Sequence, residues 1–176
     1  MTGLAPSSVP FALVALGVGM TIGNLVGGRL ADRGAVRGIF ICFAAFIVSL
    51  TVLALTVRSP VGLFGGLLLV GGSAAALSPV IQTRLMDVAG DSQTLAAAIN
   101  HSALNIGNTL GAYLGGVVIA AGFGYIAPTW VGLALCLPGV GFAIAGALVS
   151  RKWLTATGSL RTRDGDPDTG ITPIGG

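Results

Sequence analysis

The side chains that could do chemistry are few, and they lie inside otherwise apolar segments. His101, Asn105 and Asn108 are spaced i, i+4, i+7, and Thr21 and Asn24 follow a similar spacing in an earlier segment. On a helix this spacing places the members of each set on one face. Polar side chains are costly in hydrocarbon unless they face protein or a wet cavity. These five residues are therefore our candidates for contacting a polar solute within a membrane.

His101 is the sole histidine of the chain and admits two interpretations. It could relay a proton or contact a substrate, or it could be an interfacial histidine that hydrogen-bonds a loop. No Asp or Glu lies within the apolar segments, whereas a proton-coupled mechanism usually needs a buried carboxylate. Any coupling carboxylate is thus absent from these segments.

An enzymatic function has little support in the sequence. An intramembrane serine hydrolase needs a Ser–His pair and an oxyanion hole, and Ser73 with His101 is the one conceivable pair. Ser73 lacks the G-x-S-x-G setting, because Ala75 stands where the last glycine belongs. No metal-ligand cluster, P-loop or dinucleotide fingerprint is present. We predict no catalytic residue, metal or cofactor, and the hydrolase remains an alternative.

The composition places the chain in a bilayer. It has 176 residues, of which 53% are hydrophobic and 9% charged, whereas soluble domains carry about 25% charged residues. Five apolar runs each approach the roughly 20 residues that a spanning helix needs. We predict an all-α transmembrane domain over residues 1–153 and a disordered cytoplasmic tail over 154–176. The predicted spans are residues 9–28, 38–57, 61–83, 95–122 and 127–150. Cys42 and Cys136 lie in such runs and are interpreted as small buried hydrophobes.

Basic residues mark one side of the membrane. Of the nine Lys and Arg residues, only Arg58 lies on the side opposite to the other eight, which favours a cytoplasmic location for those eight. The sequence therefore predicts a bacterial cell (inner) membrane protein with its N-terminus outside and its C-terminus in the cytoplasm. The net charge of +3 is confined to loops and tail, and it does not indicate binding to nucleic acid. The eight basic residues are Arg29, Arg33, Arg37, Arg84, Arg151, Lys152, Arg161 and Arg163.

Two segments carry glycine at every fourth position, which forms a small-residue ridge that lets another helix approach closely. The first ridge is Gly19, Gly23 and Gly27, and the second ridge is Gly107, Gly111 and Gly115. Ordinary helix packing explains each glycine taken singly. The repetition of a ridge beside a polar stripe in two segments favours an interface with a further helical unit.

The loop Gly28-Arg29-Leu30-Ala31-Asp32-Arg33 resembles the signature of the major facilitator superfamily, in its looser second copy. The segments 79–85 and 98–108 resemble the branch of drug:proton antiporters and arabinose-efflux permeases. Residues 107–116 are similar to the antiporter signature, with Ala112 in place of its proline. The resemblance implies helices eight to twelve of a twelve-helix permease, a five-helix portion of its C-terminal six-helix bundle.

The resemblance also implies functions for the motifs. The parent protein would move a small solute, a drug or a sugar, by alternating access, and the two glycine ridges would meet a missing N-terminal half. Asp32, with Arg33 beside it, would latch the cytoplasmic side by pairing with Arg84, although these charges could instead serve only to hold the loop in the cytoplasm. A non-transporting truncated fragment, or a half that pairs with a separately encoded partner, is the alternative.

Overall fold

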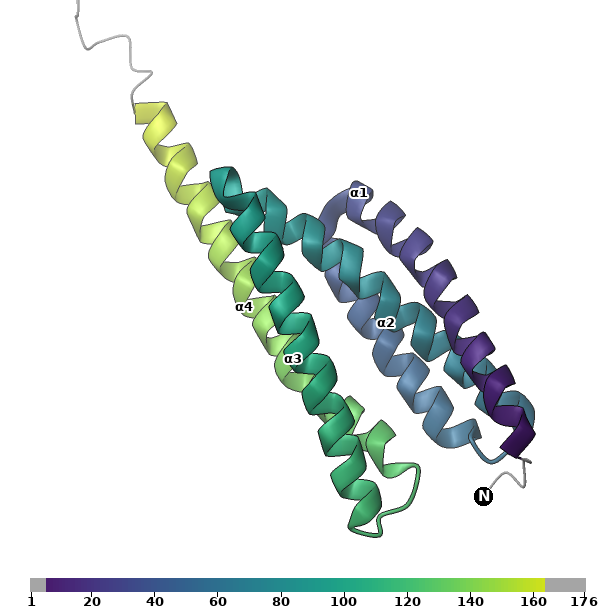
Figure 1. Ribbon diagram of the computed structural model, residues 1–176. Coiled ribbons are helices and arrows are strands. Elements are labelled where there is room, and N and C mark those ends of the chain that lie inside the picture. Colours follow the sequence, from purple (N-terminus) through teal and green to yellow (C-terminus); the bar gives the residue numbers. More distant parts are fainter. Residues whose placement is uncertain (1–5, 164–176) are drawn as a thin grey trace, which may run out of the picture. The chain divides into compact units, whose positions relative to one another are not determined.

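The protein is seen in a computed structural model that describes the backbone of residues 6–163 and the side chains of residues 7–149. Helices make up this part of the chain, which contains no strand (Figure 1). The fold class predicted from the sequence, an all-α membrane domain, is confirmed. The elements are η1 (Pro6–Ser8), α1 (Val9–Thr56), α2 (Pro60–Ala89), η2 (Gly90–Ser92), α3 (Gln93–Ala120) and α4 (Ala127–Arg163).

The chain divides into two units, residues 1–140 and 141–176, and the division falls within α4. The first unit contains α1, α2, α3 and the beginning of α4. In the second unit α4 continues as a helix to Arg163. The tail that we predict to be disordered from residue 154 is therefore helical in its first ten residues, which contain no proline. Residues 164–176 lie outside the described part of the chain.

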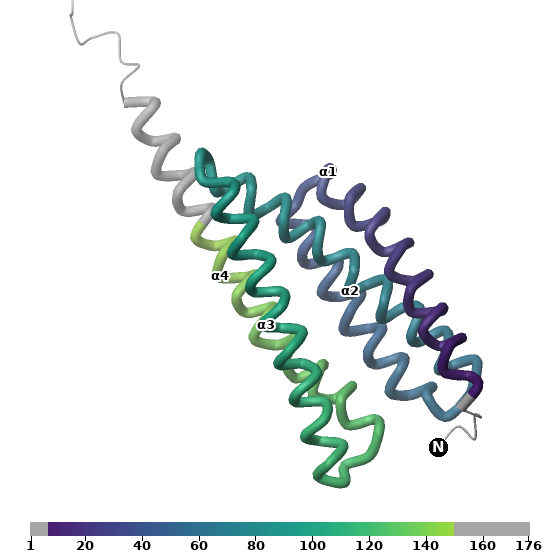
Figure 2. The backbone as a smooth tube through the Cα atoms, viewed as in Figure 1, coloured from purple at the N-terminus to yellow at the C-terminus, as the bar shows by residue number. Residues whose placement is uncertain are grey.

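Helix α1 is bent sharply at Gly34, whose φ of 139° and ψ of 102° lie outside the helical region. This positive φ favours glycine, since a Cβ would be strained there. The bend separates a first arm, residues 9–33, from a second arm, residues 35–56, and the chain reverses direction between them (Figure 2). We predict a loop over residues 29–37, but Leu, Ala and Arg there are good helix formers, so helix continues up to the bend on both sides.

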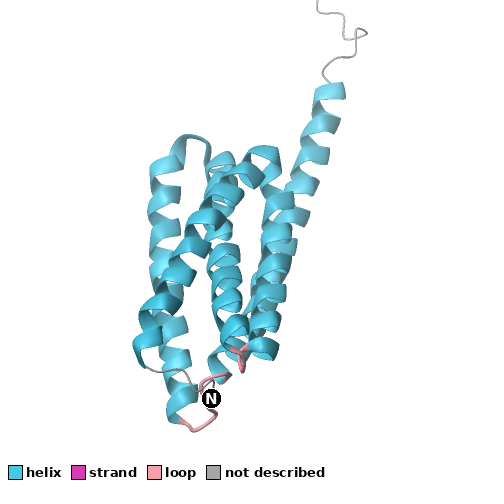
Figure 3. Ribbon diagram, turned by 90° about the vertical axis from the view of Figure 1, so that its right-hand side faces the viewer, coloured by secondary structure: helices cyan, strands magenta, loops and turns pink. Residues whose placement is uncertain are grey.

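The other helices follow the apolar runs closely. α2 begins at Pro60, with Ser59 as its N-cap: the Gly62 N–H donates to the Ser59 hydroxyl at 3.0 Å. Pro79 is accommodated inside α2 and Pro138 inside α4. Short turns and loops join the helices (Figure 3).

In the described part of the chain, three continuous helical stretches are long and apolar enough to cross a membrane: Val9–Thr56, Pro60–Ala120 and Ala127–Val149. The first two contain 48 and 61 residues, and a single crossing needs about 20. Each of these two stretches is therefore long enough to cross twice, since Gly34 interrupts one and η2 interrupts the other. The described helices thus imply contact with the lipid bilayer.

The first arm of α1 packs against α2 through the first ridge. A Cβ built at Gly23 would come within 2.7 Å of the Gly72 Cα, and one at Gly27 within 2.7 Å of the Ala76 Cα. A Cβ at Gly19 would likewise collide with the Leu68 backbone. All three glycines are buried. The two backbones therefore approach as closely as they do only because side chains are absent.

This contact corrects the expectation that the first ridge meets a missing half of the protein. The first ridge packs against α2 of the same chain, and this packing buries all three of its glycines. A stripe of small residues indicates that another helix packs closely, but it does not indicate which helix that is. The small residues Gly71, Gly72 and Ala76 of α2 supply the complementary surface.

Below the bend, five buried residues form a core where both arms of α1 meet α2. Val80 is fully buried there and Cys42 nearly so. Cys42 and Cys136 are both buried and free, which confirms their interpretation as small buried hydrophobes. The five core residues are Ala31, Ala35, Cys42, Ala76 and Val80.

The packing of the first ridge predicts opposite effects for one substitution at two positions. Gly23→Ala places a methyl group against the Gly72 backbone and should destabilise the chain by about 1–3 kcal/mol, as overpacking does. Gly17→Ala is the matched control, because nothing lies within 4 Å of its Cβ, and it should stabilise the helix by up to about 1 kcal/mol. Thermal denaturation in detergent measures both changes. Equal effects at the two positions would contradict the packing described here.

Candidate functional site

The polar stripe of the first arm of α1 lies away from α2. Thr21 and Asn24 are exposed, whereas the first ridge is buried against α2. The Thr21 hydroxyl donates to the Gly17 carbonyl at 3.0 Å, which satisfies it within its own helix. The Asn24 amide has no hydrogen-bond partner in the described part of the chain. Asn24 is therefore the group on this arm that can bind something outside the chain.

The polar stripe of α3 is also exposed. His101, Asn105 and Asn108 all lie on the surface. The Asn105 carbonyl accepts a hydrogen bond from the Thr109 hydroxyl at 2.9 Å, but this bond leaves the Asn105 side-chain amide unengaged. Among the described residues, neither asparagine amide on this stripe has a hydrogen-bond partner. The stripe thus presents donors and acceptors without internal partners.

The second ridge differs from the first. Nothing lies within 4 Å of a Cβ built at Gly107 or Gly111, and a Cβ at Gly115 would make only an ordinary contact, 3.6 Å from the Pro128 Cβ. This ridge is therefore open over most of its length in the described structure. Its predicted function as an interface stays a prediction.

The two stripes do not meet within this chain. α2 packs against both α1 and α3, and α1 and α3 do not pack against each other in the described residues. The five candidate residues are therefore placed on two separate open faces. A solute that touched both faces would need a further surface to complete its binding site.

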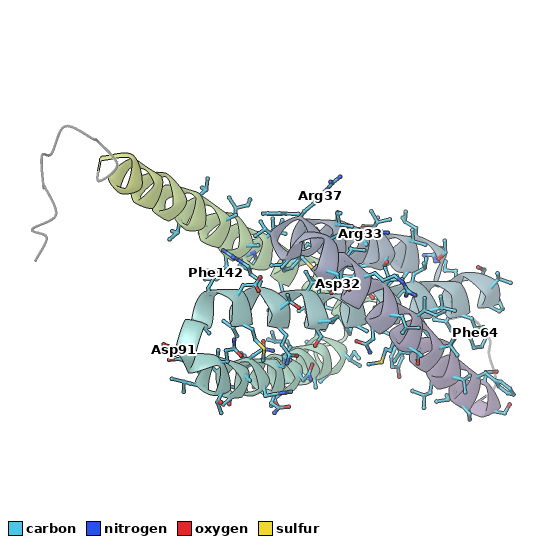
Figure 4. The ribbon with its side chains drawn as sticks, turned by 90° about the horizontal axis from the view of Figure 1, so that it is seen from above. Asp32, Arg33, Arg37, Phe64, Asp91 and Phe142 are labelled. Carbon is cyan, nitrogen blue, oxygen red and sulfur yellow. The ribbon has the colours of Figure 1, made fainter. Side chains whose placement is uncertain are left out.

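The charged residues of the signature lie at the bend of α1 (Figure 4). Asp32 and Arg33 are exposed, and Arg84 is half-buried. Nearby, Arg29 donates to the Leu25 carbonyl at 3.5 Å. The latch predicted between Asp32 and Arg84 stays a prediction.

Sequence reasoning missed a pair of hydroxyls between α1 and α2. The Ser73 hydroxyl lies 3.1 Å from the Ser49 hydroxyl and donates to the Leu69 carbonyl at 2.7 Å, while Ser49 donates to the Ala45 carbonyl at 2.7 Å. Both serines line a cavity of about 260 Å³, which we call the α1–α2 cavity. No spacing in the sequence brings Ser49 and Ser73 together, because they lie 24 residues apart on different helices.

The same contacts bear on the hydrolase alternative. Ser73 is engaged by Ser49 and by its own helix, and the α1–α2 cavity that it lines does not include His101. The structure therefore does not assemble a Ser–His pair at this serine. No group of three or more potential metal ligands occurs in the described residues.

The sequence did not predict the burial of Asn100 on α3, which is a buried polar residue in the structure.

Comparison of the sequence with known proteins shows which family the chain belongs to. The sequence profile of the Major Facilitator Superfamily matches residues 2–167. The inner membrane transport protein YdhP of Escherichia coli K12 is 38% identical over 128 residues, which cover 71% of this chain and 32% of YdhP. The MFS-type transporter YtbD of Bacillus subtilis is 29% identical over 157 residues, covering 87% of this chain and 37% of YtbD.

AraJ of Escherichia coli K12, also named as a transporter, is 29% identical over 129 residues, which cover 71% of this chain and 32% of AraJ. The chain thus spans about a third of the length of these relatives. No solved structure gives a significant match. The family profile, however, covers nearly the whole chain, and the chain belongs to the Major Facilitator Superfamily.

Proposed function

We propose that the chain forms the C-terminal helices of a permease that moves a small solute, a drug or a sugar, out of the cell by alternating access. The observation that carries this proposal is the pair of exposed asparagine-bearing faces on otherwise apolar helices. The printed names of YdhP and AraJ, both transporters, support transport as the general function.

The candidate residues are suited to binding a polar solute. An asparagine amide offers both a donor and an acceptor, and a neutral histidine does the same through its two ring nitrogens. Asn24 on α1 and Asn105 on α3 would each contact a solute whose binding site is completed by a further helical unit. Polar groups of this kind in membrane segments mark substrate pathways. In this proposal no residue is catalytic and no cofactor is required.

The proposal includes a further helical unit as partner. Transporters of this kind alternate access by rocking one helical bundle against another around a binding site near the bilayer midplane. The open second ridge and the two separate polar faces fit the surface of one such bundle. Proton exchange, as in an antiporter, would require a carboxylate from that partner, since the predicted spans contain none.

Orientation is part of the proposal as well. With the basic residues Arg29, Arg33 and Arg37 at the bend of α1, the positive-inside rule places this bend in the cytoplasm of a bacterial cell, at its inner membrane. In that orientation Asp32 would lie where the two bundles close on the cytoplasmic side. There it would pair with Arg84 when the site opens outward.

A cysteine-labelling experiment tests the polar face of α3. In the intact transporter, with Cys42 and Cys136 replaced by alanine, Asn105→Cys should react with a membrane-impermeant thiol reagent, because it would line a wet cavity. Leu110→Cys is the control, since Leu110 is equally an exposed residue of α3 but lies on the opposite side of the helix from Asn105. Labelling is read by mass spectrometry. Equal labelling at both positions would exclude a solute cavity on this face.

The latch predicts a selective loss of transport. Asp32→Asn in the intact transporter should slow solute efflux roughly tenfold, because a hydrogen bond to a charged group contributes about 1.5–3 kcal/mol, while the amount of protein in the membrane stays constant. Asp91→Asn, an exposed acid between α2 and α3, is the control and should leave efflux unchanged. Efflux from preloaded vesicles is the measurement. Unaltered efflux by the Asp32 variant would contradict the latch, and the charges at the bend would then serve only to orient the protein in the membrane.

A further inference from the structure

A second cavity lies at the bend of α1 and has a basic wall. It has a volume of about 310 Å³, and we call it the basic pocket. Arg33 directly precedes Gly34 in the sequence, and Arg37 follows it in the second arm of α1. Both arginines line the basic pocket. Gly34 and Gly38 contribute no side chains to its wall. The residues that line the basic pocket are Leu30, Arg33, Gly34, Arg37, Gly38 and Ile41.

The basic pocket carries positive charge without a compensating acid. No Asp or Glu lines it, and neighbouring Asp32 makes no ion pair with the described side chains. Guanidinium groups present planar forks of donors that match phosphate oxygens. The pocket is therefore complementary to an anion with phosphate chemistry.

The basic pocket meets the α1–α2 cavity. Leu30 and Ile41 line both, so a basic region and an apolar region adjoin at these two side chains. Ile22 and Val26 line the α1–α2 cavity and are also half-exposed, at 50% and 45%, so the cavity is bounded by side chains at the surface of α1. Its two serine hydroxyls are already engaged with each other and with carbonyls of their own helices. The remaining wall suits a hydrocarbon chain.

We propose that the bend of α1 binds one anionic phospholipid, with its phosphate between Arg33 and Arg37 and an acyl chain in the α1–α2 cavity. Charge complementarity selects the head group, and the adjoining apolar cavity selects a lipid over a free phosphate ion. Basic pockets between membrane helices are known to hold anionic head groups. This binding does not depend on the proposed transport function.

Native mass spectrometry of the full chain in detergent tests the proposal, with phosphatidylglycerol and phosphatidylcholine as probes. The chain should retain phosphatidylglycerol in preference to phosphatidylcholine. The double variant Arg33→Gln/Arg37→Gln should bind phosphatidylglycerol roughly 20-fold more weakly, given the contribution of each basic group near an anionic head group. Arg29→Gln/Arg58→Gln removes the same charge outside the pocket and should change binding less than about twofold. Equal losses in the two double variants would overturn the proposal.

A second pair of variants tests the acyl chain and leaves the charge unchanged. Ala45 lines the α1–α2 cavity and Ala44 does not, although both are exposed. Ala45→Phe should fill the cavity and reduce phosphatidylglycerol binding, whereas Ala44→Phe should not. Circular dichroism confirms folding, and if the double arginine variant does not fold, this pair decides. Equal binding by both alanine variants, or displacement of the lipid by millimolar inorganic phosphate, would show a simple anion site and overturn the lipid assignment.

Discussion

The close approach of the α1 and α2 backbones is the interaction on which the rest of the described structure depends. Lipid tails are as apolar as leucine side chains, so burial of apolar surface does not drive helices together within a bilayer. Association then depends on packing at short range, and the glycines of the first ridge permit it. At Gly23 the packing partner is Gly72, so neither helix interposes a side chain. The α1–α2 cavity and the buried core around Val80 both lie along this contact.

The bend of α1 shows how one short motif serves both packing and charge. Ala31 and Ala35 are buried in the core beside Val80, while Asp32 and Arg33 between them are exposed. The small residues of the motif hold the bend against α2, and that contact fixes where the charged residues stand. Gly34 allows the reversal because its φ is positive. Loss of the packing would therefore displace the charges as well.

The sequence was sufficient for the fold class and for the existence of the helices, because apolar runs of this length have few other solutions in a membrane. It was not sufficient for the segment around Gly34, where helix formers on both sides extend the arms to a single bent residue. It also misassigned the partner of the first ridge. The Ser49–Ser73 contact could not be predicted, since it depends on the register between α1 and α2.

The helix faces that carry the candidate residues could be predicted from the sequence, but the arrangement of these faces in space could not. The spacing of Asn105 and Asn108 correctly places them on one exposed face of α3, as the spacing of Thr21 and Asn24 does on α1. What the sequence could not show is that, among the described residues, α2 contacts both α1 and α3 while α1 and α3 do not contact each other. Proximity between stripes depends on which helices are neighbours, and periodicity within one helix carries no information about that.

The contrast between the two glycine ridges bears on what covers α3. The first ridge is filled by α2, and its neighbouring polar stripe is turned to another side. The second ridge has open space at Gly107 and Gly111, and at about 100° per residue the stripe of Asn105 and Asn108 lies roughly a quarter turn away from it. One surface could therefore cover both features of α3. Lipid would leave the amides unsatisfied, whereas a helix with polar groups of its own would satisfy them and pack closely on the ridge.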